Sequence, residues 1–571
     1  MFEEQVQKTP LATALIEDGP DDRRMSFAEL NARANQVADY LHQKGVCNEA
    51  PVAIYMQRSI EQIICLLAIL KAGCAYVPID VSNPEDRIRF ILDDADVSIG
   101  FAGNALVTPS DQICWIDICQ QREEIAQCCP DDANIDQPPE QLLQIIYTSG
   151  SSGTPKGVQN THQGAVNCID WLQTAYPFEP GEVCCHKTSI GFVDSVMELF
   201  TPLSNGISLV LIADHTLREP TALLQTLKTH RVSRIILVPT LLQWLVDRMT
   251  SETLPDLSLW LSGGEALPVK LVQQFHEVLE NRTLVNIYGS TEVSANLTWY
   301  QTSQNDIMVP IGKLVNNARM YLLDKYRQPV PIGAVGTIYA AGICLARGYT
   351  RPELNQKSFI HNILGEEYLF ETGDMGRYGC GGELEYRGRC DEQISIRGYR
   401  VEIREVEAAI LSCSDIYETA VVYNDLSGRL LSFVVGSNEL IRYELSQKLP
   451  SYMIPSLFIE VDELPRLTSG KVGKITFEDA GYLGSDKVVM PANGLEEKML
   501  KIWERVLQVS PISTHDDFFD LGGHSFTSVE LFILIEEQCG QKLPTATLFQ
   551  APTIKMLCDL MVLQNCDTPL L

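Results

Sequence analysis

A loop rich in glycine and hydroxylated residues follows an apolar stretch in the first third of the chain. Residues 144–158 read QIIYTSGSSGTPKGV. Glycines let the backbone turn its N–H groups toward an anion, and the hydroxyls and Lys156 add further donors. The segment has no G-K-[ST] and is therefore not a Walker A loop. A flexible Gly/Ser linker is the alternative, but the apolar stretch before the loop and Lys156 favour an anion-binding loop.

A second candidate site lies near the other end of the chain. Residues 516–528 read DDFFDLGGHSFTS, and Ser525 opens a helix that the pattern predicts over 525–538. The free N–H groups and the dipole of a helix N-terminus favour a phosphodiester at this position. The alternative is an ordinary serine that caps a helix.

The first 380 residues alternate short β-rich runs with amphipathic helical stretches, and these elements must position the first loop. This β-α-β rhythm predicts an α/β fold with largely parallel sheets. The examples are a strand over 52–55, a helix over 59–71 and a strand over 75–79, and then strands over 234–238 and 257–261 that flank a helix over 241–249.

The rhythm changes near residue 380, where glycines mark a turn. We expect a small α+β unit next, with strands over 393–396, 399–403, 420–422 and 431–435 and a helix over 406–411. Beyond Pro491 the pattern becomes helical, over 495–509, 525–538 and 553–563, which predicts an all-α helical bundle. The expected boundaries are a large unit over 1–390, a small unit over 391–485, a linker over 486–494 and the helical module over 495–566.

Composition excludes several classes of protein. The 571 residues include 44 basic and 74 acidic ones, a net charge of −30, and no basic run exceeds Arg23-Arg24, so we expect no nucleic-acid partner. The longest clean apolar run, Ile63 to Leu70, is too short to span a membrane, which takes about 20 residues. The 17 cysteines form no C-x-x-C motif, which favours reduced thiols. We therefore expect a cytoplasmic protein with no membrane partner.

The motifs together resemble the adenylate-forming superfamily, and specifically a nonribosomal peptide synthetase adenylation domain followed by a peptidyl carrier protein domain. Ser290 replaces the proline of the family's YGPTE motif. The further matches, in the family's order, are LKAGCAYVPID at 70–80, YGSTE at 288–292, GTIYAAGICLARGY at 336–349, ETGD at 371–374, GRCDEQISIRGYRVEIREVE at 388–407 and LTSGK at 467–471. The resemblance implies that the first two units are the large and small adenylation subdomains.

The resemblance implies an ATP site. Tyr288 would pack against the adenine, Gly263 and Gly264 would let the backbone approach it, and Asp374 would accept hydrogen bonds from the ribose hydroxyls with support from Arg389. The other positions implied to bind the nucleotide are Thr148, Ser149, Gly150, Ser151, Ser152, Gly153, Thr154 and Thr291.

The resemblance also implies the catalytic groups, which are Lys471, Lys156 and Glu292. Glu292 would help to hold Mg²⁺, a hard cation that prefers oxygen ligands. Lys471 would bridge the substrate carboxylate and the α-phosphate, where a positive charge offsets the charge of the transition state. Asp391 matches the hinge between the two subdomains, and the segment around Gly398 would face the site after a rotation, for thioester formation.

Ser525 would carry covalent 4′-phosphopantetheine. The implied partners are a small amino acid as substrate, a phosphopantetheinyl transferase, and downstream condensation or other synthetase domains. The thiol arm would convert acyl transfer into a tethered reaction with a raised effective concentration.

The substrate pocket departs from the family. Its usual F-D-x-S-V segment places an aspartate on the substrate α-ammonium, whereas residues 192–196 read Phe-Val-Asp-Ser-Val, with Val193 in that position and Asp194 next to it. Because an unpaired buried ammonium costs several kcal/mol, a β-amine within reach of Asp194 is the simplest substrate, and β-alanine is the leading candidate. The other lining positions carried over are Met197, Ile236, Trp260, Ser262, Ile287, Ala295 and Asn296.

Several alternatives stay open at this point. A one-residue shift in the pocket would admit an ordinary α-amino acid, and a keto or hydroxy acid would leave Asp194 without a cationic partner. An acyl-CoA ligase is a different class of enzyme, against which the carrier module argues. An inactive carrier or scaffold protein is the remaining alternative, against which Lys471, Asp374, Glu292 and Lys156 argue.

Overall fold

The structure is a computed structural model, and it divides into two compact units, Met1–Glu405 and Val406–Leu571. The residues that it describes are 1–19, 22–103, 108–133, 135, 137–150, 153–361, 365, 368–379, 381–396, 398–424, 429–438, 440–465, 489–507, 509–518, 521, 523, 525–541, 543 and 547–566.

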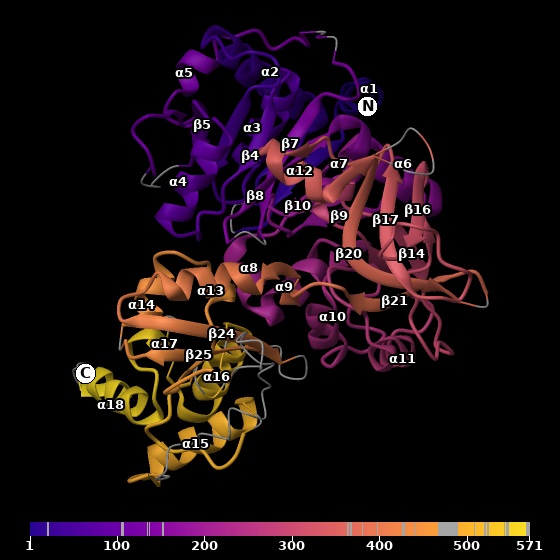
Figure 1. The fold of residues 1–571 in the computed structure, drawn as a ribbon. Helices are drawn as coiled ribbons and strands as arrows, with labels where there is room; N and C mark the ends of the chain where they lie inside the picture. Colours follow the sequence, from indigo (N-terminus) through magenta and orange to yellow (C-terminus); the bar gives the residue numbers. More distant parts are fainter. Residues whose placement is uncertain are drawn as a thin grey trace. The chain divides into compact units, whose positions relative to one another are not determined.

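Two largely parallel sheets form the framework of the larger unit (Figure 1). The first has the order β15 (Lys313–Leu314), β14 (Thr298–Gln301), β13 (Thr283–Tyr288), β12 (Leu259–Ser262), β11 (Arg234–Leu237), β9 (Val183–His186), β10 (Ser208–Leu211), β1 (Thr13–Glu17) and β2 (Arg24–Ser26). The second has the order β18 (Gly348–Tyr349), β8 (Lys156–Thr161), β7 (Leu142–Thr148), β4 (Ala75–Pro78), β3 (Pro51–Tyr55), β5 (Ile99–Ala102) and β6 (Cys114–Ile116). The central pairs are parallel, as the β-α-β rhythm predicts.

Helices connect and cover these strands. Ser26 begins α2 with a capping box in which it exchanges hydrogen bonds with Glu29, and Ser59 caps α3 through Gln62 N–H. The helices of the larger unit are α1 (Phe2–Lys8), α2 (Phe27–Gln43), α3 (Ile60–Lys71), α4 (Glu85–Asp94), α5 (Arg122–Ile125), α6 (His162–Ala175), α7 (Ser195–Ser204), α8 (Asp214–Arg218), α9 (Pro220–Thr229), α10 (Pro239–Val246), α11 (Val269–Val278) and α12 (Pro352–Ser358), with a 3-10 turn, η1 (Thr291–Val293).

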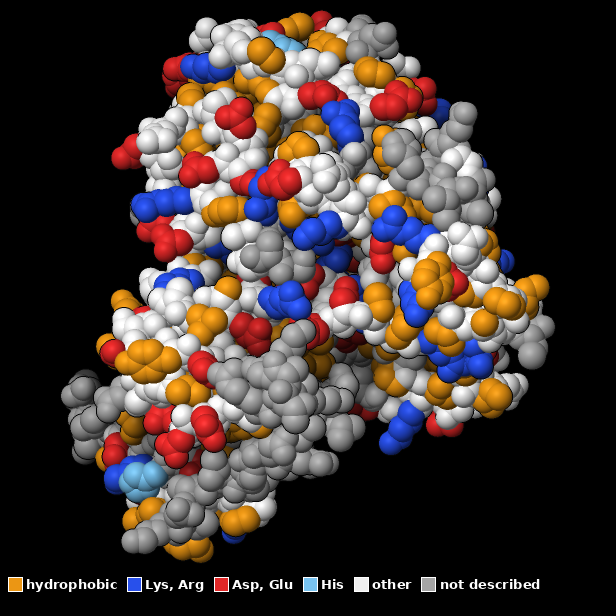
Figure 2. All heavy atoms as spheres, in the orientation of Figure 1, with side chains coloured by type: hydrophobic (Ala, Val, Ile, Leu, Met, Phe, Trp, Pro, Cys, Tyr) orange, Lys and Arg blue, Asp and Glu red, His pale blue; other side chains and the backbone are white. Residues whose placement is uncertain are grey.

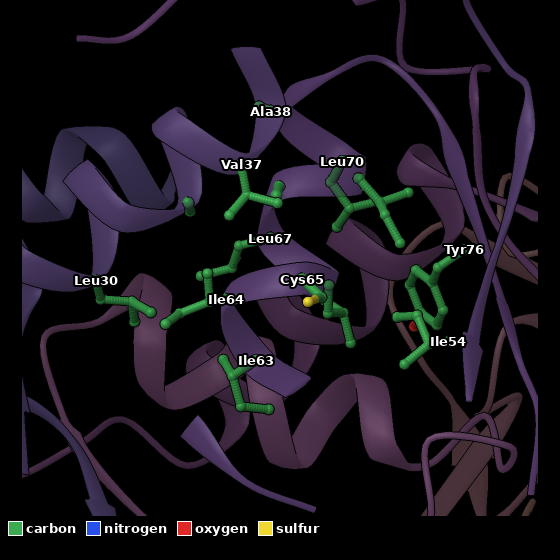
Figure 3. Packing of buried hydrophobic residues seen from close by; sticks show 14 of the residues in the cluster. Leu30, Val37, Ala38, Ile54, Ile63, Ile64, Cys65, Leu67, Leu70 and Tyr76 are labelled. Carbon is green, nitrogen blue, oxygen red and sulfur yellow. The ribbon is translucent and has the colours of Figure 1, made fainter. Parts of the chain in front are cut away.

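The helix α3 lies at the centre of the largest apolar cluster. It is apolar on nearly all sides, because α2 covers it on one side and the sheet on the other. Figure 3 shows Leu30 and Val37 of α2 near Ile64 of α3, and Ile54 and Tyr76 of the strands close to the same helix. This core includes Leu143 of β7 and so anchors the strand from which the glycine-rich loop begins.

An antiparallel sheet follows in the chain and carries the next motifs. Its strands are β16 (Ala318–Leu323), β17 (Gly336–Gly342), β19 (Phe359–His361), β20 (Tyr368–Tyr378) and β21 (Leu384–Arg389). The hairpin of β22 (Gln393–Ile396) and β23 (Tyr399–Glu402) comes next and belongs to the larger unit. The observed division after Glu405 therefore lies beyond Asp391, the boundary that we expected.

The smaller unit contains a sheet and a group of helices. The strand β24 (Ile416–Asn424) pairs antiparallel with β25 (Arg429–Gly436), which pairs parallel with β26 (Leu457–Glu460). The helices are α13 (Ile403–Leu411), which crosses the boundary between the units, α14 (Ile441–Ser446), the 3-10 turn η2 (Ser451–Met453), α15 (Gly494–Leu507), α16 (Ser525–Cys539), α17 (Thr547–Gln550) and α18 (Ile554–Cys566). Residues of α15, α16, α17 and α18 share one apolar cluster around Trp503, so the expected order of an α/β unit, a small α+β unit and a helical bundle is confirmed.

The surface, the helices and the cysteines can be compared with the expectations from composition. On the face of the larger unit that Figure 2 shows, acidic and basic side chains are interspersed. Within the described ranges, none of the helices combines the length and the apolar composition needed to cross a membrane. The described cysteines are all free thiols.

Candidate active site

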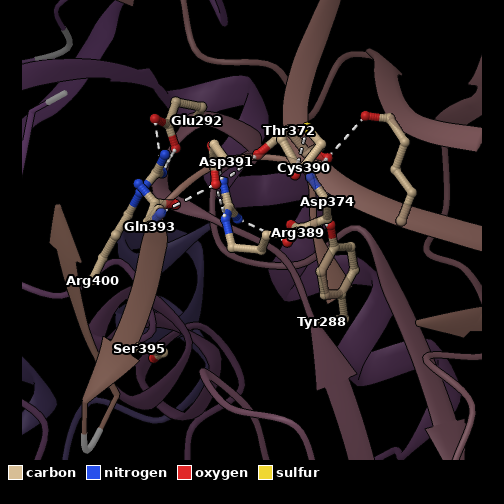
Figure 4. Close-up of polar contacts among 12 residues, drawn as sticks. Tyr288, Glu292, Thr372, Asp374, Arg389, Cys390, Asp391, Gln393, Ser395 and Arg400 are labelled. Atoms are coloured by element: carbon tan, nitrogen blue, oxygen red, sulfur yellow. Dashed lines mark hydrogen bonds and ion pairs between the residues drawn. The ribbon is translucent and has the colours of Figure 1, made fainter. Parts of the chain in front are cut away.

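The residues expected to bind ribose lie together where β20 pairs with β21. The register places Asp374 opposite Arg389. Arg389 Nη1 donates to Asp374 Oδ1 at 2.7 Å, and the Tyr288 hydroxyl donates to Asp374 Oδ2 at 2.7 Å (Figure 4). Each carboxylate oxygen can accept a further bond, so this carboxylate can still receive hydroxyl donors.

The guanidinium of Arg389 also holds Asp391, the expected hinge residue. Arg389 Nε donates to Asp391 Oδ1 at 2.6 Å and Nη2 donates to Oδ2 at 2.8 Å. Burial would lower the pKa of Arg389, but Asp391 and Asp374 raise it above its usual value. Burial raises the pKa of Asp374 even though Arg389 and Tyr288 oppose the shift. One arginine thus connects the ribose candidate with the hinge candidate.

The glycine-rich loop joins β7 to β8 as a hairpin in which Thr148 lies opposite Lys156. A Cβ atom on Gly150 would lie 2.0 Å from the Thr154 carbonyl oxygen, so the turn requires glycine here. Arg351 Nη1 donates to Thr154 Oγ1 at 3.1 Å, and Gly153 has a φ of +83°. The expected positions Ser151 and Ser152 lie outside the described residues.

Two groups of this loop form hydrogen bonds with the segment that follows Asp391. Ser149 Oγ donates to the Arg400 carbonyl oxygen at 2.7 Å. Gly150 N–H donates to Glu405 Oε2 at 3.0 Å. The Gly150 N–H, which the sequence pattern predicts to bind an anion, therefore donates a hydrogen bond to a carboxylate of the chain itself.

Glu292 is the centre of a buried charge cluster. It lies in η1 and its side chain is 0% exposed. Arg400 Nη1 contacts its two carboxylate oxygens at 3.0 and 2.8 Å (Figure 4), Lys156 Nζ lies 3.2 Å from Oε1, and the Tyr349 hydroxyl donates to Oε1 at 2.9 Å. Arg400 and Tyr349 lie within the motifs at 388–407 and 336–349, but no local pattern predicts that they contact Glu292.

The cluster keeps Glu292 ionised. Burial would raise the pKa of this carboxyl, but Arg400 and Lys156 outweigh burial and hold the pKa well below its usual range. Burial and then Arg400 lower the pKa of Lys156, against the pull of Glu292.

Glu292 has the donor chemistry that Mg²⁺ requires. A buried, ionised carboxylate is a hard oxygen ligand, and Mg²⁺ usually takes one or two carboxylates together with phosphate oxygens and water. Within the described residues, no group of three or more His, Cys, Asp or Glu side chains gathers into a metal site. Glu292 therefore fits Mg²⁺ that arrives with a phosphate-bearing substrate.

The expected adenine loop and the expected thiolation loop meet in this structure. Ser395 Oγ donates to the Gly264 carbonyl oxygen at 2.6 Å, and Gly398 N–H donates to Glu265 Oε1 at 2.9 Å. A Cβ atom on Gly398 would lie 2.5 Å from Val238 Cγ1, and one on Gly264 would lie 3.5 Å from Gly398 Cα. Both have a positive φ, so this close approach suits glycine. The other expected adenine-loop residue, Gly263, is next to Gly264.

Most of the pocket candidates share one apolar cluster. Asn296 contacts this cluster through its amide, since Asn296 Nδ2 lies 2.9 Å from Met197 Sδ. The positive φ of Ala295, +93°, turns the chain directly after η1. The pocket candidates that belong to this cluster are Val193, Met197, Ile236, Ile287 and Ala295.

Trp260 does not lie with the other pocket candidates. The register pairs Ile235 with Trp260 and Ile236 with Leu261, and successive side chains of a strand point to opposite faces. The Trp260 ring is fully buried against Phe275 of α11, with ring centroids 5.6 Å apart. Leu261, and not Trp260, shares the cluster of Ile236, while the assignment of Trp260 to the pocket stays a prediction. The alternation of a strand was the signal that could have identified this.

Ser262, the next pocket candidate, is completely buried at the end of β12. Its Oγ has no hydrogen-bond partner among the described residues. In the register it lies beside Leu237, which belongs to the cluster of Trp260.

The carboxylate of Asp194 has no partner among the described residues. It is the N-cap residue of α7, yet its side chain does not cap the helix, and in the described part of the chain no hydrogen bond or ion pair is made by its carboxylate. Burial, and then the nearby Glu198, raise its pKa to about 6 in spite of Lys187. Glu198 itself is paired, with Lys187 Nζ at 3.4 Å and His186 Nδ1 at 3.3 Å. Asp194 thus differs from Glu198 in having no cationic partner within the described structure.

Two expected residues have no described side-chain geometry. Lys471 and its LTSGK motif lie outside the described residues. Ser525 is the first residue of α16, as the sequence predicts, but its side chain lies outside the described part.

A family model for the AMP-binding enzymes matches residues 2–350, which include the glycine-rich loop, η1 and the pocket strands. The chain belongs to the AMP-binding enzyme family. The model of the C-terminal domain of these enzymes matches residues 405–471, and that of the phosphopantetheine attachment site matches residues 497–561. The predicted adenylation and carrier architecture is thereby confirmed.

Curated relatives align along the whole chain. Tyrocidine synthase 3 of Brevibacillus parabrevis is 35% identical over 100% of this chain and 9% of its own length. Gramicidin S synthase 2 of Aneurinibacillus migulanus is 34% identical over 99% of this chain and 13% of its own length. The chain therefore spans only about a tenth of the length of these relatives.

Solved structures share the fold. A holo nonribosomal peptide synthetase protein with adenylation and PCP domains, bound to a vinylsulfonamide inhibitor, has a TM-score of 0.83 and 24% identity, over 98% of this chain and 95% of that one. An o-succinylbenzoate CoA synthetase from Bacillus subtilis has a TM-score of 0.73 and 22% identity, over 82% of this chain and 96% of that one. The fold alone thus includes CoA ligases, and the matched carrier domain separates this chain from them.

This AMP-binding enzyme is an AMP-forming ligase with an adenylation part and a thiolation part, as expected. Its cofactors are ATP and covalent 4′-phosphopantetheine.

Proposed function

We propose that this AMP-binding enzyme activates a small β-amino acid, with β-alanine as the leading candidate, and loads it onto its own carrier domain. The carboxylate attacks the α-phosphate of ATP, which forms aminoacyl-AMP and releases pyrophosphate. The pantetheine thiol on Ser525 then displaces AMP and forms the thioester. The loaded unit would pass to downstream condensation or other synthetase domains in nonribosomal peptide biosynthesis.

The carboxylate of Asp194, which has no partner in the described part of the chain, carries the proposal of a β-amino acid. Val193, in the position where the family usually has aspartate, is buried among Met197, Ile236 and Ile287 and cannot pair with an ammonium. Asp194 lacks a partner among the described residues, and its raised pKa reflects the cost of that isolation. An ammonium displaced by about one carbon toward Asp194 would relieve this cost, whereas a keto or hydroxy acid would not.

The remaining site residues take the roles expected from the motifs. Asp374 and Arg389 would hold the ribose, and Tyr288 the adenine. Glu292 would be a ligand of Mg²⁺, and Lys156 adds positive charge 3.2 Å from it. Lys471 would neutralise the charge shared by carboxylate and α-phosphate. A phosphopantetheinyl transferase would supply the arm on Ser525.

A pyrophosphate-exchange panel tests the substrate. We expect the strongest signal from β-alanine or a small substituted β-amino acid, well above α-alanine and above keto and hydroxy acids. Preference for an α-amino acid would support a shifted pocket instead. Transfer of the product to CoA rather than to the carrier would support an acyl-CoA ligase, and absence of exchange with every acid would support an inactive scaffold.

A further inference from the structure

The segment from Arg400 to Glu405 brings two opposite charges to the two places assigned to magnesium and phosphate. Arg400, in β23, contacts the oxygens of Glu292 at 3.0 and 2.8 Å. Glu405, in α13, accepts from Gly150 N–H of the glycine-rich loop at 3.0 Å and from Arg87 Nη1 at 2.7 Å. Both carboxylates are buried, with side chains 0% and 3% exposed.

Arg400 has the same sign of charge as Mg²⁺, and Glu405 has the same sign of charge as a phosphate. A guanidinium on Glu292 compensates the same negative charge that Mg²⁺ would compensate. A carboxylate oxygen on Gly150 N–H accepts the hydrogen bond that a phosphate oxygen would accept. The Arg400 guanidinium, 2.8 Å from Glu292, would repel Mg²⁺ bound to the same carboxylate, and Gly150 has one N–H to donate, so the two sets of contacts oppose each other.

We propose that Arg400 and Glu405 are built-in placeholders for Mg²⁺ and for a phosphate oxygen, and that their segment competes with magnesium-bound phosphate for Glu292 and Gly150. The inference rests on the proposed roles of Glu292 and of the loop. Binding of the phosphates of Mg·ATP displaces the segment, and loss of magnesium pyrophosphate lets it return. The two half-reactions are thereby separated by charge, because the segment occupies the site only after pyrophosphate has left.

AMP supplies an internal control. It binds through adenine and ribose, to which Tyr288, Asp374 and Arg389 are assigned, and it carries neither the metal nor the terminal phosphates. The placeholders should therefore oppose magnesium pyrophosphate and leave AMP unaffected.

The experiment measures dissociation constants of the full chain by calorimetry, for pyrophosphate with Mg²⁺ and separately for AMP. Glu405→Gln keeps the size of the side chain and removes its charge, and Arg400→Met removes the guanidinium. We expect each to bind magnesium pyrophosphate roughly tenfold more tightly, the scale of one charged hydrogen bond, with unchanged affinity for AMP. Arg87→Gln combined with Glu405→Gln repeats the test without leaving a buried, unpaired Arg87.

Matched controls lie on the same elements. Among the described residues Arg404 pairs with the exposed Glu392, so Arg404→Met should match the parent protein. Glu407→Gln should also match it, since the Glu407 carboxylate accepts from Val421 N–H. Thermal unfolding identifies folded variants.

The outcomes separate the inference from the proposed site. If Glu292→Gln weakens magnesium pyrophosphate binding while Arg400→Met and the Glu405 variants leave it unchanged or weaker, the placeholder inference is overturned and the site stands. An equal gain for AMP also overturns the inference, because the effect would not be specific for phosphate. If Glu292→Gln changes nothing, the assigned role of Glu292 fails, and the inference fails with it.

Discussion

Replacing Asp194 by asparagine should abolish most activation of β-alanine and leave the fold intact. The substitution keeps the size of the side chain and removes the carboxylate that lacks a partner in the described structure. Because no described hydrogen bond or helix cap depends on that carboxylate, we expect no loss of thermal stability. The defect should therefore lie in the substrate complex.

The size of the effect follows from the pairing. Removing one partner of a buried ion pair costs about 3–5 kcal/mol. At about 1.4 kcal/mol for each factor of ten, kcat/KM should fall roughly 10²- to 10³-fold or somewhat more. A keto or hydroxy acid should show no such loss, since it carries no ammonium.

The pH dependence gives a second measure of the same pairing. The ammonium requires the ionised form of Asp194, whose pKa burial raises to about 6. In the parent protein kcat/KM for β-alanine should therefore be full above that pH and fall as the pH decreases through it, approaching about tenfold per pH unit. Asp194→Asn should lack this acidic limb.

Pyrophosphate exchange with saturating Mg·ATP measures both effects. Asp256→Asn is the matched control, since Asp256 pairs with the exposed Arg231 at 2.8 Å and such surface pairs contribute little. Undiminished exchange with β-alanine by Asp194→Asn would refute the reasoning. So would a parent profile without an acidic limb near pH 6.

Three further predictions concern the assigned chemistry. Lys471→Ala should lower adenylate formation by roughly 10²- to 10³-fold in a folded protein, and near-normal pyrophosphate exchange would remove Lys471 from this role. Coexpression with a phosphopantetheinyl transferase should add one arm to the parent and none to Ser525→Ala, which should still adenylate; intact mass decides, and a modified variant would contradict the assignment. Asp374→Asn should weaken AMP binding roughly tenfold or more, because hydrogen bonds to a charged group contribute about 1.5–3 kcal/mol each, and an unchanged dissociation constant for AMP would place the ribose elsewhere.

Local pattern was sufficient for much of the fold. The strand over Gln393–Ile396 has the predicted bounds, and α16 begins at Ser525 as predicted. Such elements depend on signals a few residues apart, such as the glycine turn before a helix or the alternation within a strand. The ordered motifs likewise identified an ATP-dependent enzyme with a carrier domain.

The boundary between the units depended on tertiary contacts. The motif around Asp391 predicts a hinge, but the compact units divide after Glu405. The hairpin of β22 and β23 stays with the larger unit because Ser395, Gly398 and Arg400 bond to Gly264, Glu265 and Glu292. The partners in each pair are more than 100 residues apart in the sequence, where no local pattern links them.

The sequence by itself determined which residue types are available for chemistry. These are a glycine-rich loop, a carboxylate in YGSTE, an aspartate one residue beyond its usual position in the family, and a serine at a helix start. Only the tertiary structure decided their partners. It directed the Trp260 ring away from Ile236, gave Asp194 no partner among the described side chains, and placed Arg400 on Glu292. The physical reason is that burial and pairing set the charge and reactivity of a side chain, and both depend on which distant strands and helices fold against it.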